Sequence, residues 1–140
     1  MDGIKLINFN VFDNGSNGRL TPLEGGIDIP FEINRIYYIT QVQKGVRRGF
    51  HSHKELQQVL ICLHGSVKIM VKTPVAEQVI DLNSSTLGLY IGPMIWREMY
   101  DFSPEAVLLV LASRHYDESD YIRDYLEYNK FANKYFGLEE

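Results

Sequence analysis

The stretch "RRGFHSHKELQQVLICLHGSV", residues 47–67, decides the fold class of this chain. Its second half, residues 57–63, is a run of apolar and β-favouring side chains that ends at the turn dipeptide "HG". The next segment, residues 66–73, has an apolar side chain at every second position, which is typical of a strand that buries one face. The apolar side chains on that face are Val67, Ile69 and Val71. Both segments are therefore predicted to be β-strands.

Six further runs of β-type composition are separated by turns that contain Gly, Pro, Asn or Ser. These runs are residues 4–10, 35–42, 77–82, 87–91, 96–102 and 106–113. Many short strands joined by short turns are typical of a sandwich or a barrel. Residues 117–135 differ, because acidic residues open the segment and tyrosines then recur at helical spacing. We expect one all-β domain over residues 1–140, with a C-terminal helix at about 117–135.

Composition excludes several classes of partner. The 140 residues, 45% hydrophobic and 23% charged, suit one globular domain. A net charge of −4 and the lack of a basic tract argue against nucleic acid. No run approaches the ~20 apolar residues of a membrane span, and no secretion signal is recognisable at the start. The single cysteine, Cys62, predicts a buried thiol in a reducing cytoplasm.

His51 and His53 are the first candidates for a functional site. Side chains two residues apart on a strand point to the same face, so the two imidazoles should lie together. They could be metal ligands, acid/base groups or packing residues. A single strand histidine is more often a packing residue, whereas a same-face pair preceded by Gly49 favours a site.

"GFHSHKELQQVLICLHGSV" resembles the first motif of the cupin superfamily, and "LGLYIGPMIWREM" resembles the second. The resemblance implies a jelly-roll β-barrel. Metal-binding cupins typically use three histidines and one glutamate, but here Gln58 stands at the acidic position and Arg97 at the third histidine position. An amide is a weak neutral ligand and a guanidinium cannot ligate, so we expect no metal, although Glu55 could supply a carboxylate. The histidines would then be free for proton chemistry.

The match is closer than the superfamily. Four segments, "IPFEINRIYYI", "RRGFHSHKELQQVLICLHGSVKI", "LGLYIGPMIWREMYDF" and "VLLVLASRHYDESDYIRDY", resemble the cupin-type sugar-nucleotide 3,4-ketoisomerases. Members of that family are homodimers that move the carbonyl of dTDP-4-keto-6-deoxyglucose from C4 to C3 without a cofactor. Their products feed the synthesis of 3-amino-3,6-dideoxy sugars for bacterial surface glycans. The resemblance covers about residues 20–125 and implies a cytoplasmic isomerase.

The reaction requires a base at C3, a proton donor for C4 and a stabiliser for the enediol oxygen. Histidine suits the first two roles because its unperturbed pKa, ~6.5, is near working pH. We expect His51 to act as the base and His53 to shuttle or donate a proton, although the sequence does not fix which does which. Resemblance favours Tyr37 over its neighbour Tyr38 as the residue that hydrogen-bonds the enolate.

Five further residues are expected to bind the substrate. Arg35 and Arg48 lie in the matched motifs, and arginine forks suit a pyrophosphate. Arg97 and Gln58 are expected near the sugar. Arginine at position 97 resembles the family branch with a gluco-configured product, dTDP-3-keto-6-deoxyglucose. Asn17 lies in a glycine-rich loop that is also associated with product choice.

Three alternatives remain open. The first is a cupin epimerase on the same sugar nucleotide, which would be longer and use a His–Asp or His–Tyr pair; no His–Asp pairing is recognisable in the sequence. The second is a non-catalytic cupin that binds a sugar nucleotide. The third is a metal-dependent oxygenase or isomerase, which would lose activity on chelation.

Overall fold

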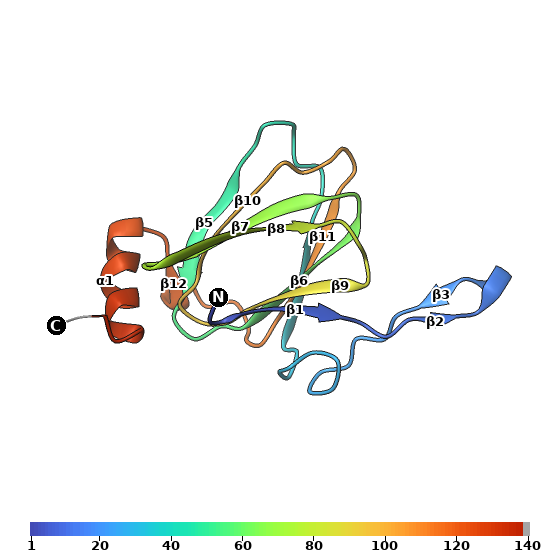
Figure 1. Ribbon diagram of the computed structural model, residues 1–140, viewed down its shortest axis with the longest axis horizontal. Helices are drawn as coiled ribbons and strands as arrows, with labels where there is room; N and C mark the ends of the chain where they lie inside the picture. Colours follow the sequence, from blue (N-terminus) through green and yellow to red (C-terminus); the bar gives the residue numbers. More distant parts are fainter. Residues whose placement is uncertain (139–140) are drawn as a thin grey trace.

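The computed structural model describes residues 1–138 and consists of two antiparallel five-stranded sheets that pack face to face, with one short helix at one end (Figure 1). The first sheet has the order β1 (Ile4–Asn8), β9 (Leu87–Ile91), β6 (Gln58–His64), β11 (Val107–Ala112) and β4 (Arg35–Ile39). The second has the order β12 (Tyr121–Ile122), β5 (Arg48–His53), β10 (Trp96–Tyr100), β7 (Val67–Thr73) and β8 (Ala76–Leu82).

The all-β prediction is confirmed, and the barrel takes the form of an open jelly roll. From β4 onward the chain passes repeatedly from one sheet to the other, which is the connectivity of a double-sheet jelly roll. Within residues 1–138 the two sheets share no hydrogen-bonded ladder, so the strands do not close into a ring. No helix in this part of the chain is long and apolar enough to cross a membrane.

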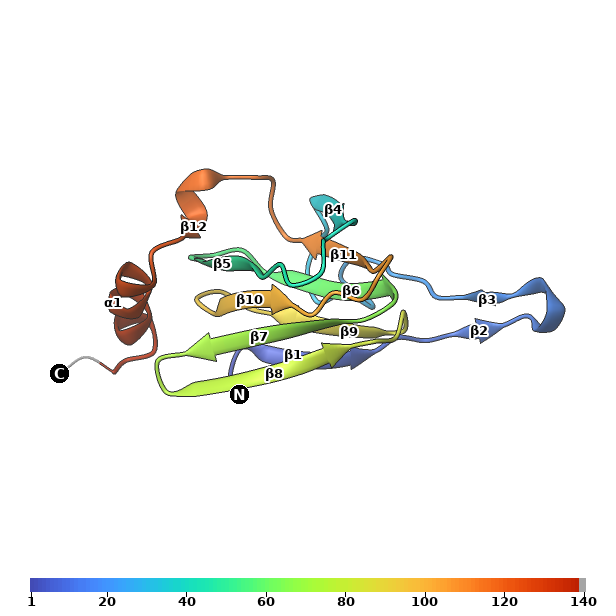
Figure 2. The ribbon, with the colours of Figure 1, turned by 90° about the horizontal axis from the view of Figure 1, so that it is seen from above.

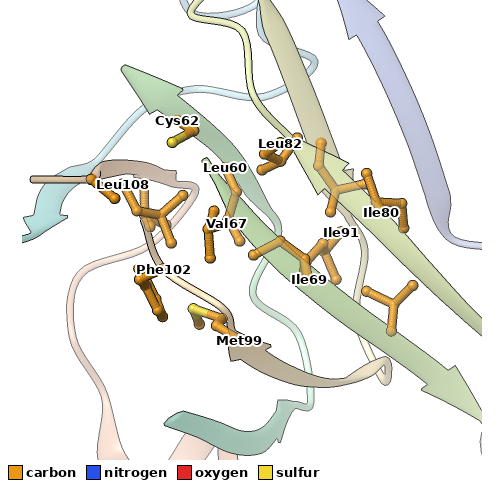
Figure 3. Close-up of a cluster of buried hydrophobic side chains, with 14 of the residues drawn as sticks. Leu60, Cys62, Val67, Ile69, Ile80, Leu82, Ile91, Met99, Phe102 and Leu108 are labelled. Atoms are coloured by element: carbon orange, nitrogen blue, oxygen red, sulfur yellow. The ribbon is translucent and has the colours of Figure 1, made fainter. Parts of the chain in front are cut away.

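Apolar side chains from both sheets meet between them (Figure 3). Leu60 and Leu108 of the first sheet pack with Ile69 of the second, and each is fully buried. The alternation predicted for β7 is present, because Val67 and Val71 are buried as well while Lys68 and Lys72 of the opposite face are partly exposed. Met70 shares that opposite face but is buried, because it packs with Trp96 and Tyr128. Such burial contributes roughly 25 cal/mol per Å² of apolar surface and is the main force that holds the sheets together.

The outer face of the first sheet is covered by the segment that precedes β4. Ile29 and Phe31 of this segment pack on Val59, Ile61 and Leu111, which point outward from β6 and β11. This cover explains why β6 and β11 are apolar on both faces. The sheet that supplies Tyr37 to the candidate site is therefore packed on its outer face by this segment.

Helix α1 (Tyr125–Tyr135) is shorter than the predicted helix at 117–135. Its N-cap, Asp124, accepts hydrogen bonds from the backbone N–H groups of Leu126 and Glu127, and so fixes the start of the helix. The preceding residues form a 3-10 turn, Glu118–Asp120, and strand β12, which pairs with β5. Sheet pairing overrides the helical pattern here, and it places Tyr121 beside the histidine strand.

A hairpin of β2 (Phe12–Asp13) and β3 (Arg19–Leu20) projects from the end opposite the helix (Figure 2). A 3-10 turn, Gly15–Asn17, joins its two strands. Asn17 therefore lies at the tip of the hairpin, outside the body of its own chain, and it does not line the site described below.

Candidate active site

Strand β5 brings the two histidines together. It pairs with β10 on one side, where Arg97 lies opposite His51, and with β12 on the other, where Tyr121 lies opposite His53. The ring centroids of the two histidines are 4.9 Å apart, with the rings edge to face. Both side chains are buried. The spacing of the pair thus produces the close placement that the sequence predicts.

Gly49 allows the backbone of β5 to approach β10 closely just before His51. Its φ of +100° is a conformation that other residues adopt only under strain, and a Cβ there would lie 3.1 Å from the carbonyl oxygen of Arg97 and 3.2 Å from the Cα of Glu98. The ladder between β5 and β10 is irregular at this point. The close approach allows the Gly49 carbonyl to face the His51 ring.

His51, and not His53, lies on the wall of the cavity that we call the main cavity because it adjoins the histidine pair; cavities of about 470 and 280 Å³ elsewhere on the chain are larger. This cavity of about 210 Å³ is lined by Tyr37, Ile39, Arg48, Gly49, His51, Met99, Tyr121 and Arg123. His53 is only 1% exposed and borders a much smaller cavity of about 10 Å³ together with Arg35 and Asp120. The structure therefore separates the two histidines, which the sequence could not distinguish.

His51 is held in one tautomer. Its Nδ1 lies 3.0 Å from the carbonyl oxygen of Gly49. A carbonyl can only accept, so Nδ1 carries the proton and Nε2 presents a lone pair. Burial, followed by the charge of Arg97, lowers the pKa of His51 to about 3. The imidazole is accordingly neutral at pH 7, as a general base must be.

His53 contacts a carboxylate that the sequence analysis overlooked. Its Nδ1 lies 3.3 Å from Oδ2 of Asp120, which is an ion-pair distance, although the approach is not that of a linear hydrogen bond. Burial, followed by the charge of Arg97, lowers the pKa of His53 well below its usual range. The expectation that the chain has no His–Asp pairing is wrong, so that argument against an epimerase no longer stands.

We expect the two histidines to make the protein less stable in acid. Their folded pKa values lie below the unfolded value of about 6.5, so the unfolded state binds more protons below that pH. The free energy of unfolding should fall between pH 7 and pH 5, by about 2 kcal/mol for each histidine. Urea unfolding at the two pH values measures this, and His51→Asn should reduce the pH dependence by about 2 kcal/mol. An unchanged dependence in the variant would contradict the lowered pKa.

A buried network joins Arg97 to Tyr37. Nη1 of Arg97 donates to Oε1 of Gln58 at 2.6 Å, and Nε2 of Gln58 donates to the Tyr37 hydroxyl at 3.1 Å. Arg97 is 1% exposed and also donates to the carbonyl of Ile95. Burial lowers its pKa to about 10, so it remains charged at pH 7. Arg97 and Gln58 thus lie behind the cavity wall, and their contact with a sugar stays a prediction.

The predicted pyrophosphate residues occupy different positions. Arg48 lines the main cavity and is exposed. The guanidinium of Arg35 lies over the rings of Tyr37 and Tyr116, at 5.2 and 5.6 Å, and its buried Nε has no hydrogen-bond partner among residues 1–138. Only Arg48 is therefore placed where a ligand in the main cavity would meet it directly.

Arg123 and Tyr121 were missed as cavity residues. The guanidinium of Arg123 lies 4.2 Å from the Tyr121 ring and is also bonded to Glu118. The Tyr121 ring contacts both histidines, with centroid distances of 5.2 Å to His51 and 4.3 Å to His53. The sequence interpretation placed Tyr121 on a helix, which hid its pairing with β5.

The side chains around the histidines do not fit a metal centre. Glu55 is exposed and its Oε2 pairs with Nη1 of Arg114 at 2.6 Å, so it does not supply the carboxylate considered above. The charged Arg97 guanidinium lies behind the pair, and Nδ1 of His51 is occupied by a carbonyl. No group of three or more His, Cys, Asp or Glu side chains within residues 1–138 is arranged to hold an ion.

Known proteins resemble this chain in sequence and in fold. The family model described as "FdtA: WxcM-like, C-terminal" matches residues 2–133. A TDP-4-oxo-6-deoxy-alpha-D-glucose-3,4-oxoisomerase from Aneurinibacillus thermoaerophilus is 46% identical over 130 residues, 93% of each chain.

Two solved structures are also similar. One is an asparagine variant of the 3,4-ketoisomerase QdtA from Thermoanaerobacterium thermosaccharolyticum, in complex with TDP-4-keto-6-deoxyglucose. It is 56% identical, with a TM-score of 0.94, and the match covers 97% of this chain and 98% of the other. The other is the TDP-quinovose 3,4-ketoisomerase WlaRB from Campylobacter jejuni, at 42% identity and a TM-score of 0.89, with 93% and 99% covered. By its sequence and its fold, this chain belongs to the FdtA, WxcM-like family.

Proposed function

We propose that this chain is an isomerase that converts dTDP-4-keto-6-deoxyglucose into a dTDP-3-keto-6-deoxyhexose. The family relationship supports the substrate class, since its relatives are named as 3,4-ketoisomerases or oxoisomerases of TDP-linked sugars. The observation that carries the chemistry is the placement of His51. A neutral imidazole with a free Nε2 lies on the wall of a cavity that it shares with Tyr37.

The carbonyl moves by removal of a proton from C3, delivery of a proton to C4 and a proton shift between the two oxygens. His51 takes the proton from C3, the electrons of that bond form the C3–C4 double bond, and the C4 oxygen becomes an enolate. The proton of the C3 hydroxyl then passes to the C4 oxygen, the electrons left on the C3 oxygen form the C3 carbonyl, and the electrons of the double bond take up a proton at C4. We assign the first step to His51 because it lies on the cavity wall. The role of proton shuttle falls to His53, whose ring lies beside it.

The buried network orients Tyr37 for the enolate. Because Gln58 donates to the Tyr37 oxygen, the phenolic proton must point away from Gln58, and Tyr37 also lines the cavity, where an enolate could accept it. Burial raises the pKa of Tyr37, so the phenol keeps its proton at neutral pH. The Arg97 charge polarises this chain of donors and favours negative charge at its end. This arrangement supports Tyr37 as the oxyanion donor.

The product is assigned to the gluco series, and Arg48 and Arg35 to the pyrophosphate. Arg48 borders the cavity, and arginine suits bidentate contact with phosphate oxygens. Arginine at position 97 supports the gluco product, as does the likeness to an enzyme named for TDP-quinovose. The expected pathway is the synthesis of 3-amino-3,6-dideoxy sugars, in the cytoplasm, where the lone thiol of Cys62 would stay reduced.

Incubation with dTDP-4-keto-6-deoxyglucose in deuterium oxide tests the function. We expect deuterium at C4 of a 3-keto product and exchange at C3 of recovered substrate, both followed by proton NMR. The C4 coupling pattern, read after amination of the product, should show the gluco configuration. Deuterium at C5 would indicate an epimerase, and tight binding without exchange would indicate a non-catalytic cupin. Full activity after chelation would separate this reaction from that of a metal-dependent enzyme.

The projecting hairpin supports a homodimer. Phe12 and Leu20 on the hairpin are 57% and 54% exposed, and an isolated two-stranded hairpin is marginally stable in water. In a dimer, the hairpin would pack on the second copy and carry Asn17 toward it. Strand β1 pairs with β9 of the same chain, so the dimer does not require its exchange. Sedimentation equilibrium should give twice the mass of the chain; a monomer would exclude the dimer.

A further inference from the structure

Asp120 is the buried acidic group closest to the catalytic histidines. It ends the 3-10 turn at Glu118–Asp120, just before β12, and it is 8% exposed. Its Oδ1 accepts the backbone N–H of Glu55 at 2.9 Å, and its Oδ2 accepts that of Leu56 at 3.3 Å. These two bonds fix the carboxylate on the loop that follows β5.

The same carboxylate oxygen lies beside one ring nitrogen of His53. Oδ2 of Asp120 lies 3.3 Å from Nδ1 of His53. An ionised carboxylate can only accept, so the neutral ring is favoured when its proton is on Nδ1. The Nε2 atom is then unprotonated. Within the described part of the chain neither ring nitrogen of His53 makes a hydrogen bond, so Asp120 acts on Nδ1 through its charge. The Tyr121 ring, 4.3 Å away, restricts the His53 ring from the other side.

We propose that Asp120 is a positioning residue that holds His53 with its proton on Nδ1, so that Nε2 is the atom that takes up and releases the shuttled proton. This role rests on the proposed ketoisomerase function. When Nε2 takes a proton, His53 becomes an imidazolium whose Nδ1–H faces the Asp120 carboxylate. When Nε2 releases the proton, the neutral ring returns to the same tautomer.

Several positive charges surround His53, so a protonated His53 needs the Asp120 carboxylate beside it. Arg97, Arg35 and Arg123 each oppose a positive charge on the ring, as does a protonated His51. These groups come from β10, β4, the segment after β12 and β5 itself. Within residues 1–138, Asp120 is the only carboxylate at ion-pair distance from His53. Without that carboxylate, a transient imidazolium would be buried among cations, and the shuttle would slow.

The tautomer can be measured directly by NMR on the full chain labelled with ¹⁵N-histidine. We expect the wild-type His53 spectrum to show a protonated Nδ1 and an unprotonated Nε2. In Asp120→Asn, the amide can no longer act only as an acceptor, and we expect a shift toward the tautomer with the proton on Nε2. The kcat for dTDP-4-keto-6-deoxyglucose should fall by about 10²-fold while KM changes less than about threefold.

Asp124→Asn is the matched control. It makes the same chemical change four residues later, and asparagine preserves the N-cap of α1. We expect its His53 spectrum and its kcat to equal those of the wild type. A wild-type His53 with its proton on Nε2 would overturn the proposal, even if Asp120→Asn does not fold. A wild-type kcat in a folded Asp120→Asn, or an effect on KM alone, would also overturn it. The spectrum remains informative if the protein proves not to be a ketoisomerase.

Discussion

His51→Asn is expected to lower kcat by about 10²–10⁴, the range for the loss of a general base. Asparagine fits the space and keeps a polar group, but it cannot take a proton from C3. Because the Nε2 of His51 is the free imidazole nitrogen on the cavity wall, no other side chain there can replace it as the base. Turnover of dTDP-4-keto-6-deoxyglucose and deuterium exchange at C3, both followed by NMR, measure the effect.

The affinity of the His51→Asn variant for TDP shows whether its nucleotide site is intact. The affinity for TDP should change little, since the nucleotide is assigned to Arg48 and Arg35. His64→Asn is the control substitution, because His64 is exposed at the end of β6 and does not line the cavity. Activity like that of the wild type in both His51→Asn and His53→Asn would refute the assignment of proton transfer to this pair.

Tyr37→Phe is expected to lower kcat by about 10²–10³, as the removal of one oxyanion donor does in other enzymes. The change deletes only the hydroxyl that faces the developing enolate. It also leaves Nε2 of Gln58 without its acceptor, which should cost about 1–3 kcal/mol of stability. Steady-state kinetics measure the first effect, and urea unfolding measures the second.

Tyr38→Phe is the control for this position. Tyr38 follows Tyr37 on β4, points to the opposite face and is 69% exposed. The same deletion there should leave kcat and stability unchanged. If Tyr37→Phe kept the wild-type kcat and lost only stability, then Tyr37 would be a packing residue and the oxyanion donor would have to be sought elsewhere.

Local pattern was sufficient for much of the fold and for the core of the site. The alternation in β7 and the spacing of His51 and His53 depend only on the two-residue period of a strand, so both could be derived from neighbouring residues. Tyr37 was distinguished from Tyr38 by resemblance, and the structure places it on the cavity. The gluco product and the absence of a metal stay predictions.

Long-range pairing explains what the sequence did not reveal. The residues 117–124 have a helical pattern, yet β12 forms there because it completes the edge of a sheet with a strand about seventy positions earlier. That pairing brings Tyr121 and Asp120 to the histidines. The burial of Arg97 likewise depends on Gln58 of the opposite sheet. Neither contact leaves a signal in the residues next to it.

The Arg97 guanidinium has a consequence for the resting protein. Within residues 1–138 no carboxylate lies at ion-pair distance from it, so Arg97 is a buried cation whose hydrogen-bond partners, Gln58 and the Ile95 carbonyl, are neutral. A hydrophobic residue of similar volume often stabilises a protein at such a position. In the proposed reaction, the enolate would place a negative charge near this cation and offset part of the cost of burying it. Selection for higher stability would therefore favour replacement of Arg97, whereas selection for turnover would favour its retention.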